Sequence, residues 1–354
     1  MSGALSTYGF LNAKLKARIS GILSEGKIEE LVRAKSLPEA MILLKGTAFE
    51  PLEASYTRTG DLRGGESLLY TMEIELYTGL LRYAKEPIAS LFTSLAARYE
   101  VDTLKTAIRL WFDSRVRGRD IEDGSVYLYR GTILHTLDLD AILAATNADE
   151  LARALEGTPY QAVVRDYGPK AETEKTLFPL ETALDRQYYG ALIDSFSALS
   201  PRDREIAVRV LGVEIDMYNI EWLIRAQSFY RLSMEEALAA LIPNGMAFEP
   251  SQIAAAYNAG NISDLLSELL KKKYGRFQVL LGKGVEQSSR LAFMERLLRQ
   301  ILLAEAERLL SGYPFTIGVA LAYFALKRQE IRTVLTILNA KYYLLPEERI
   351  RSTL

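Results

Sequence analysis

Two short sequence patterns each occur three times in this chain of 354 residues, about one third of its length apart. Copies of the first block begin at Ser36, Asn147 and Asn261, and copies of the second begin at Glu100, Asp216 and Glu330. The first block steps by 111 and 114 residues and the second by 116 and 114. A repeat of this length predicts three copies of one small domain, which we place at residues 1–116, 117–231 and 232–354.

The first block predicts the start of a helix in each copy. A polar residue is followed three residues later by an acid, as in the capping box, where side chains satisfy the free amides of a helix start. The pairs are Ser36 with Glu39, Asn147 with Glu150 and Asn261 with Asp264. Gly46 and Gly157 follow where a glycine would end the helix.

Apolar residues recur at helical spacing along almost the whole chain, which predicts an all-α fold. Pro87, Pro201 and Pro314 suit the beginnings of further helices, and residues 166–179 are predicted to form a longer irregular excursion. Three similar helical domains in tandem can close around a pseudo-threefold axis. We therefore predict a funnel-shaped molecule with a central cavity.

Charge and composition exclude several classes of function. The net charge of −2 gives no electrostatic reason to expect a nucleic-acid partner. The chain has no cysteine, so disulfides and thiolate metal sites are excluded. The longest apolar run, residues 315–326, is far shorter than the roughly 20 residues that cross a bilayer, so no transmembrane segment is expected.

The sequence lacks the usual signatures of catalysis. His135 is the only histidine, and we interpret it as a helix or turn residue. Neither nucleotide-binding glycine motif is present, so we expect no catalytic, cofactor-binding or metal-binding residues. Glu100, Asp216 and Glu330 occur once per repeat at the same place, which favours a structural or interface role over acid-base catalysis.

The repeated blocks, with three further segments, resemble a known family. The segments are residues 8–18, 327–334 and 345–351, and they accompany the Leu-x-Gly-Thr-x-Phe/Tyr sequences of the first block. Together they resemble the C subunit of the bacterial and archaeal V/A-type ATPases, which corresponds to the d subunit of eukaryotic V-ATPases. Thr103 and Thr333 depart from the asparagine that the family pattern has at the place of Asn219.

The resemblance implies a non-catalytic part of a rotor rather than an enzyme. Such a protein is a helical funnel at the cytoplasmic face of the membrane, peripheral to it. It would couple the central stalk to the membrane proteolipid ring during ATP-linked proton or sodium transport. A stiff body with two distinct surfaces suits that role, and each interface should bury on the order of 1,000 Å².

Three cations are candidates for a partner interface: Arg109, Arg225 and Lys341. Each stands at, or within two positions of, the same place at the end of the second block. Some of them would line the central opening and meet an acidic partner. The alternative is that they pair with Glu100, Asp216, Glu330 or other acids inside each domain.

Two other functions are compatible with the residues alone. One is a free-standing helical scaffold that binds a soluble partner, and the other is an all-helical enzyme that uses paired acids with a metal. The chain has no Asp-Asp-x-x-Asp cluster to hold such a metal. Co-purification separates a rotor part from a scaffold, because a rotor part should travel with the ring and the stalk.

Overall fold

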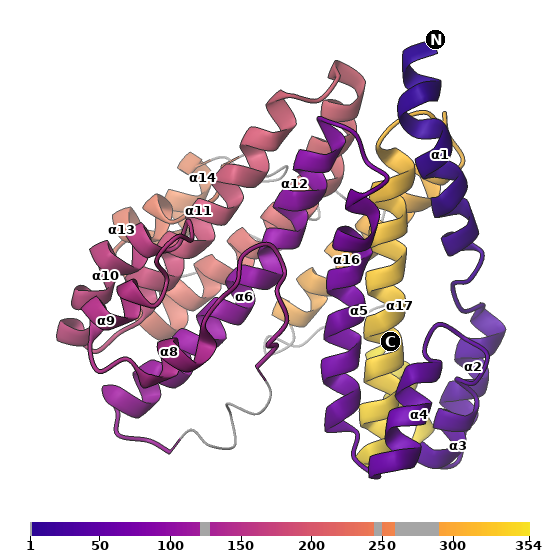
Figure 1. Ribbon diagram of the computed structural model, residues 1–354, viewed down its shortest axis with the longest axis horizontal. Coiled ribbons are helices and arrows are strands. Elements are labelled where there is room, and N and C mark those ends of the chain that lie inside the picture. The colour runs from indigo at the N-terminus through magenta and orange to yellow at the C-terminus, as the bar shows by residue number, and fades with distance from the viewer. Residues whose placement is uncertain (1, 121–127, 244–249, 259–289) are drawn as a thin grey trace. The chain divides into compact units, whose positions relative to one another are not determined.

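The computed structural model describes residues 2–120, 128–243, 250–258 and 290–354, and the regular structure in these ranges is helical (Figure 1). No strand occurs within them, which confirms the all-α expectation for this part of the chain. The third copy of the first block, residues 261–274, lies outside the described residues.

The chain divides into two compact units. Unit 1 contains residues 1–8 and 189–325, and unit 2 contains residues 9–188 and 326–354. Unit 2 is therefore built from segments near both ends of the chain. The three-domain division at 116/117 and 231/232 stays a prediction.

The helices of unit 2 come largely from the first half of the chain. They are α2 (Glu25–Arg33), α3 (Leu37–Ile42), α4 (Glu50–Thr59), α5 (Arg63–Leu81), α6 (Ile88–Arg115), α8 (Leu139–Ala144), α9 (Ala148–Arg153), α10 (Gln161–Glu174) and α18 (Glu347–Thr353). Unit 1 holds α12 (Pro201–Arg225), the π-helix η1 (Ala226–Tyr230), α13 (Met234–Ala239), α14 (Pro250–Asn258) and α16 (Arg290–Leu310). Three helices contribute residues to both units: α1 (Ser2–Ile19), α11 (Phe178–Ser197) and α17 (Gly318–Tyr342).

The core of unit 2 is formed around α6, which packs against α5 and α8. Its side chains Phe92, Trp111 and Phe112 are fully buried. Burial of each large apolar side chain contributes about 1.5–3 kcal/mol. Pro87 immediately precedes α6 and Pro201 is the first residue of α12, as predicted, whereas α17 begins four residues after Pro314.

The first two copies of the first block have the same local structure. Ser36 and Asn147 are N-cap residues with extended backbones, and each side chain accepts a hydrogen bond from the amide three residues later. Each cap opens a helix of six residues, α3 or α9. Gly46 and Gly157 both have a positive φ, of 71° and 79°, which glycine adopts without steric cost. The N-cap predictions for these two copies are confirmed. The prediction that the glycines end the helices is wrong, because the C-caps are Leu43 and Ala154 and each glycine lies in the turn that follows.

The same agreement extends to the threonines that follow the glycines. Thr47 Oγ1 donates to the carbonyl of Leu44 at 2.6 Å, and Thr158 Oγ1 donates to that of Leu155 at 2.7 Å. Each hydroxyl also accepts a hydrogen bond from the amide two residues later. Two segments 111 residues apart therefore share one hydrogen-bond pattern.

The prediction of an irregular excursion at residues 166–179 is wrong for most of this segment. Helix α10 continues to Glu174 with Pro169 inside it. A Cβ on Gly168 would lie 3.0 Å from the Cβ of Ala148, so this glycine allows α10 to pack closely against α9. The close packing of α10 against α9 compensates for the loss of the helical hydrogen bond that Pro169 cannot donate.

Among the helices that the structure describes, none combines the length and the apolar character that a bilayer crossing requires.

Candidate functional site

The three candidate interface residues lie in the long helices that carry the second block. Arg109 lies in α6, Arg225 is the last residue of α12, and Lys341 lies in the last turn of α17. Their surroundings differ, so each is described separately.

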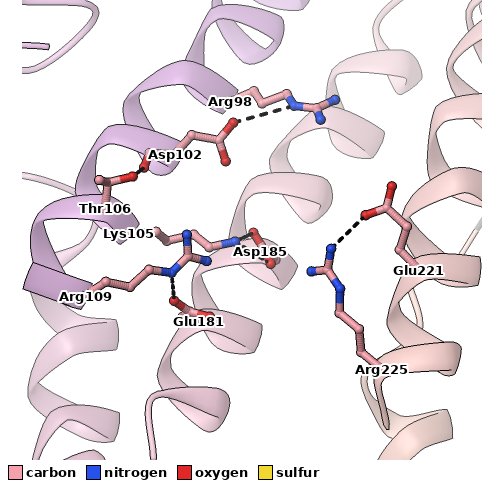
Figure 2. A network of polar contacts seen from close by, with 9 residues as sticks. All are labelled: Arg98, Asp102, Lys105, Thr106, Arg109, Glu181, Asp185, Glu221 and Arg225. Atoms are coloured by element: carbon pink, nitrogen blue, oxygen red, sulfur yellow. Dashed lines mark hydrogen bonds and ion pairs between the residues drawn. The ribbon is translucent and has the colours of Figure 1, made fainter. Parts of the chain in front are cut away.

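Arg109 belongs to a cluster of charges between α6 and α11 (Figure 2). Its Nε donates to Glu181 Oε1 at 2.5 Å, and Lys105 Nζ contacts both carboxylate oxygens of Asp185 at 2.8 Å. The two cations are four residues apart on α6, and the two acids are four residues apart on α11. Residues at this spacing share one helix face, so two cations on one helix meet two acids on the other.

The two ion pairs differ in their exposure to solvent. The side chains of Lys105 and Asp185 are largely buried, whereas that of Arg109 is 52% exposed. Burial lowers the pKa of the Arg109 guanidinium, but the hydrogen bond and the charge of Glu181 outweigh this, so the net pKa shift is upward. An exposed pair of this kind contributes about 0–1 kcal/mol. Arg109 thus stays charged and accessible while it contacts Glu181.

Arg225 is exposed at the end of α12. Its Nη2 lies 3.4 Å from Glu221 Oε2, one helical turn earlier (Figure 2). Such a surface pair contributes about 0.3–0.5 kcal/mol, so a partner carboxylate could replace Glu221 at little cost.

Lys341 is only 8% exposed and holds the end of α2. Its Nζ donates to the carbonyls of Val32 at 2.6 Å and Ala34 at 2.5 Å. The last carbonyls of a helix have no partner within the helix, and a lysine can satisfy them. These contacts support a structural role for Lys341. An interface role stays a prediction for all three cations.

Trp111 occupies the position in α6 that corresponds to Lys341 in α17. Each lies eleven residues after the acid of its second block, Glu100 or Glu330. Trp111 Nε1 donates to the carbonyl of Ala145 at 2.9 Å, and Ala145 is the C-cap of α8 as Ala34 is the C-cap of α2. The same position of the repeat therefore carries two different donors, an indole N–H and an ammonium group, and each hydrogen-bonds the C-cap carbonyl of a short helix.

The acids of the second block are buried: Glu100 is 1% exposed, Asp216 0% and Glu330 5%. Glu100 accepts hydrogen bonds from the amides of Leu134 and His135 at 2.8 and 2.6 Å. Glu330 accepts one from the amide of Leu23 at 2.7 Å and contacts Lys327 Nζ at 2.5 Å. Glu100 thus attaches α6 to the segment before α8, and Glu330 attaches α17 to the segment before α2. These contacts support the structural interpretation of both acids.

The only histidine lies in a bend and is part of the Glu100 contact. His135 Nδ1 lies 2.7 Å from Glu100 Oε1, and the Tyr160 hydroxyl donates to the same oxygen at 2.8 Å. Burial, together with the neighbouring carboxylate, raises the pKa of Tyr160. His135 is therefore engaged in holding the chain, and no group of three or more metal-binding side chains gathers anywhere among the described residues.

Sequence reasoning missed Lys105, Glu181 and Asp185. A signal for them was present in the sequence. Lys105 and Arg109 are two cations at i,i+4 spacing, and Glu181 and Asp185 are two acids at the same spacing. Arg225 pairs with Glu221 inside the predicted second domain, whereas the partner of Arg109, Glu181, lies beyond the predicted boundary at 116/117. Neither partner is an acid of the second block.

Comparison with known proteins gives a match along almost the entire chain. The family model described as ATP synthase (C/AC39) subunit matches residues 11–353. The A-type ATP synthase C subunit of Methanosphaera stadtmanae is 23% identical over 334 residues, covering 94% of this chain and 84% of the relative. The protein of the same name from Pyrococcus abyssi is 24% identical over 93% of this chain and 85% of its own length. That of Desulfurococcus sp. (strain SY) is 26% identical over the same shares.

Proposed function

Because the chain belongs to the ATP synthase (C/AC39) subunit family, we propose that it is a non-catalytic central-rotor subunit of a V/A-type rotary ATPase. The family match confirms the resemblance seen in the repeated blocks. It is also the observation that carries the proposal, because it extends over residues 11–353.

In this role the protein is a socket between the central stalk and the membrane proteolipid ring. It sits at the cytoplasmic face of the membrane, peripheral to it, and couples rotation to proton or sodium transport. The three repeats form three helical domains around a pseudo-threefold axis, and the central cavity of the funnel receives the stalk.

The contacts of the second block support a mechanical function. A part that transmits torque must resist deformation, and Glu100 and Glu330 are buried acceptors that tie long helices to distant segments. Lys341 and Trp111 add a second tie eleven residues further along α17 and α6. Buried hydrogen bonds of this kind are costly to break, because the partner group is left unsatisfied.

Co-purification tests the proposed place in the complex. Tagged protein from cells or reconstituted membranes should bring down the detergent-solubilised ring and the stalk proteins together. Recovery of the protein with neither component, or with a soluble partner only, would contradict the proposal.

Arg109 and Arg225 are the candidates for contact with an acidic stalk partner. Charge reversal at Arg109 alone is ambiguous because it also breaks the pair with Glu181. The double variant Arg109→Glu with Glu181→Arg restores an internal pair with reversed polarity. If Arg109 meets the stalk, the double variant keeps its stability but loses stalk binding; restored binding would assign Arg109 a purely internal role.

Arg225→Glu needs no such compensation because its pair with Glu221 is exposed. We expect weaker stalk binding and reduced ATP-driven pumping. The matched control is Arg165→Glu, which breaks an exposed pair with Asp166 on α10. If Arg225→Glu and Arg165→Glu affect stalk binding and pumping equally, Arg225 does not contribute to the interface.

A further inference from the structure

One surface of unit 2 combines an exposed phenylalanine and a half-buried tyrosine with cations that have no carboxylate partner among the described residues. It is formed by the second half of α1 and the end of α5, and we define it by Phe10, Lys14, Arg18, Arg82 and Tyr83. Phe10 is 67% exposed, and its ring centroid lies 5.5 Å from that of Tyr83. Leu11 and Leu15 hold α1 to the core from the neighbouring face of the helix, because both are buried.

The cations of this surface gather around the Tyr83 ring and the face of α5. Lys14 Nζ lies 5.4 Å from the Tyr83 centroid, and the Arg82 guanidinium carbon lies 4.7 Å from it. Arg18 lies against Gly79, where a Cβ would meet its guanidinium at 3.8 Å. The two contacts with the Tyr83 ring orient Lys14 and Arg82 without neutralising either charge.

Acids are missing from this part of the sequence. Residues 1–24 contain three basic residues and no Asp or Glu. Among the described residues no carboxylate pairs with Lys14, Lys16, Arg18 or Arg82, whereas Arg33, Arg109, Arg225 and Arg351 all have one. The nearest acid after Tyr83 is Glu86, which accepts a hydrogen bond from the Ser90 hydroxyl. The surface therefore has a positive charge that only an external anion can balance.

We propose that this surface binds the headgroup region of an anionic phospholipid membrane. Lysines and arginines near such a surface contribute about 1 kcal/mol each, and aromatic side chains settle at the boundary between headgroups and acyl chains. Phe10 supplies the apolar tip that enters this boundary, and the cations around Tyr83 lie at the level of the phosphates. This contact goes beyond the proposed rotor role, which requires contact with other proteins only.

The exposed Phe10 favours lipid over an acidic protein segment. A purely electrostatic partner gains from Lys14, Arg18 and Arg82 but leaves the Phe10 ring in water. A membrane surface accepts the ring and the charges together, as it does for an amphipathic helix that lies in the interface.

Vesicle flotation of the isolated full-length chain tests the proposal without any other protein. We expect binding to vesicles of phosphatidylcholine with phosphatidylglycerol, no binding to phosphatidylcholine alone, and release at high salt. Lys14→Gln and Arg82→Gln should each weaken binding about fivefold, which corresponds to about 1 kcal/mol per charge. Phe10→Ala should also weaken vesicle binding.

Tyr167 and Lys170 provide a matched control on α10, since they are an exposed aromatic and an exposed lysine on one helix of mixed charge. Tyr167→Ala with Lys170→Gln should leave vesicle binding unchanged. Circular dichroism of every variant verifies that the helices are retained.

Two outcomes would overturn the proposal. One is absence of binding to anionic vesicles, or binding that the surface variants leave unchanged. The other is binding to immobilised polyglutamate that Lys14→Gln abolishes and Phe10→Ala does not, without vesicle binding, which would assign the surface to an acidic protein. Neither outcome bears on co-purification with the ring and stalk, so the rotor proposal is tested separately.

Discussion

At the scale of single residues, Lys341 and Trp111 show how one position in a repeat can keep its function while its chemistry changes. An ammonium group and an indole N–H have little in common except a donor that can reach a helix end. In both places the recipient is the C-cap alanine of a short helix, Ala34 or Ala145. The feature that the repeats share is therefore the hydrogen bond and not the side chain.

Replacement of Lys341 by alanine should destabilise the protein by about 1–3 kcal/mol, because the buried carbonyls of Val32 and Ala34 lose their donor. Urea unfolding measures this change. Lys35→Ala is the matched control, since Lys35 is exposed beside the same helix end and should be nearly neutral. Equal midpoints for the two variants would show that Nζ does not hold α2.

The sequence predicts the residues whose partners are near in the chain. Ser36 and Asn147 cap helices as expected, because their partners are three residues away and the pattern contains both members. Repeat position makes Lys341 an interface candidate, yet it contacts carbonyls 309 and 307 residues away, which no local pattern contains. Periodicity predicts the all-α class, whereas the α6–α11 charge cluster depends on which helices become neighbours.

At the scale of elements, the two copies of the first block act as an internal duplicate. Thr47 and Thr158 each bridge a carbonyl and an amide in the turn after a six-residue helix. The sequence-based prediction is wrong at α10 because Gly168 and Pro169 are typical of a break, while packing of α10 on α9 keeps the helix intact.

Thr47→Val and Thr158→Val should each destabilise the protein by a similar amount, about 1 kcal/mol, because each removes the same two hydrogen bonds from a nearly isosteric side chain. Chemical denaturation of both variants gives the comparison. Thr106→Val is a control, since this exposed hydroxyl bonds only within its own helix. If one variant changes the free energy of unfolding and the other does not, the two turns are not energetically equivalent.

Helix α18 is attached to α2 by a contact that depends on pH. Arg351 donates to both carboxylate oxygens of Glu29, and chiefly this hydrogen bond lowers the pKa of Glu29 from 4.5 to about 2. A carboxylate with a lowered pKa stabilises the folded state above pH 4.5, and this contribution is lost as the pH falls toward about 2.

Arg351→Gln should therefore raise the pKa of Glu29 and make the protein less stable than the wild type above pH 4.5. The difference in stability should shrink as the pH falls toward about 2, where the wild type also loses the contact. NMR titration of Glu29 and urea unfolding at a series of pH values measure both effects. An offset that is independent of pH, as expected for the exposed control Arg58→Gln, would contradict the assignment.

At the scale of the whole molecule, unit 2 depends on segments from both ends of the chain. Glu330 and Lys341 on α17 hold residues 23–34, and Arg351 on α18 holds Glu29. The amino-terminal helices of unit 2 thus lack their full set of partners without the last 29 residues, 326–354.

Deletion of residues 326–354 should expose the region around α2 and α3 to proteolysis and hydrogen exchange, because Glu330 and Lys341 are removed together. Deletion of residues 347–354 alone removes α18 and should have a smaller effect. Mass spectrometry of protected amides locates the change. Full protection of residues 23–34 in the longer deletion would show that the amino-terminal segment is stable by itself.

The dependence of residues 23–34 on α17 has a consequence for biosynthesis. A ribosome adds about 5–20 residues per second, so Lys341 leaves the peptidyl transferase centre about 15–60 seconds after Val32. During that interval the nascent α2 segment lacks the donor for its last carbonyls, and its apolar side chains Leu31 and Val32, buried in the folded protein, are still without α18, which packs against α2. A general chaperone that recognises short apolar stretches would find a target in this segment until translation ends.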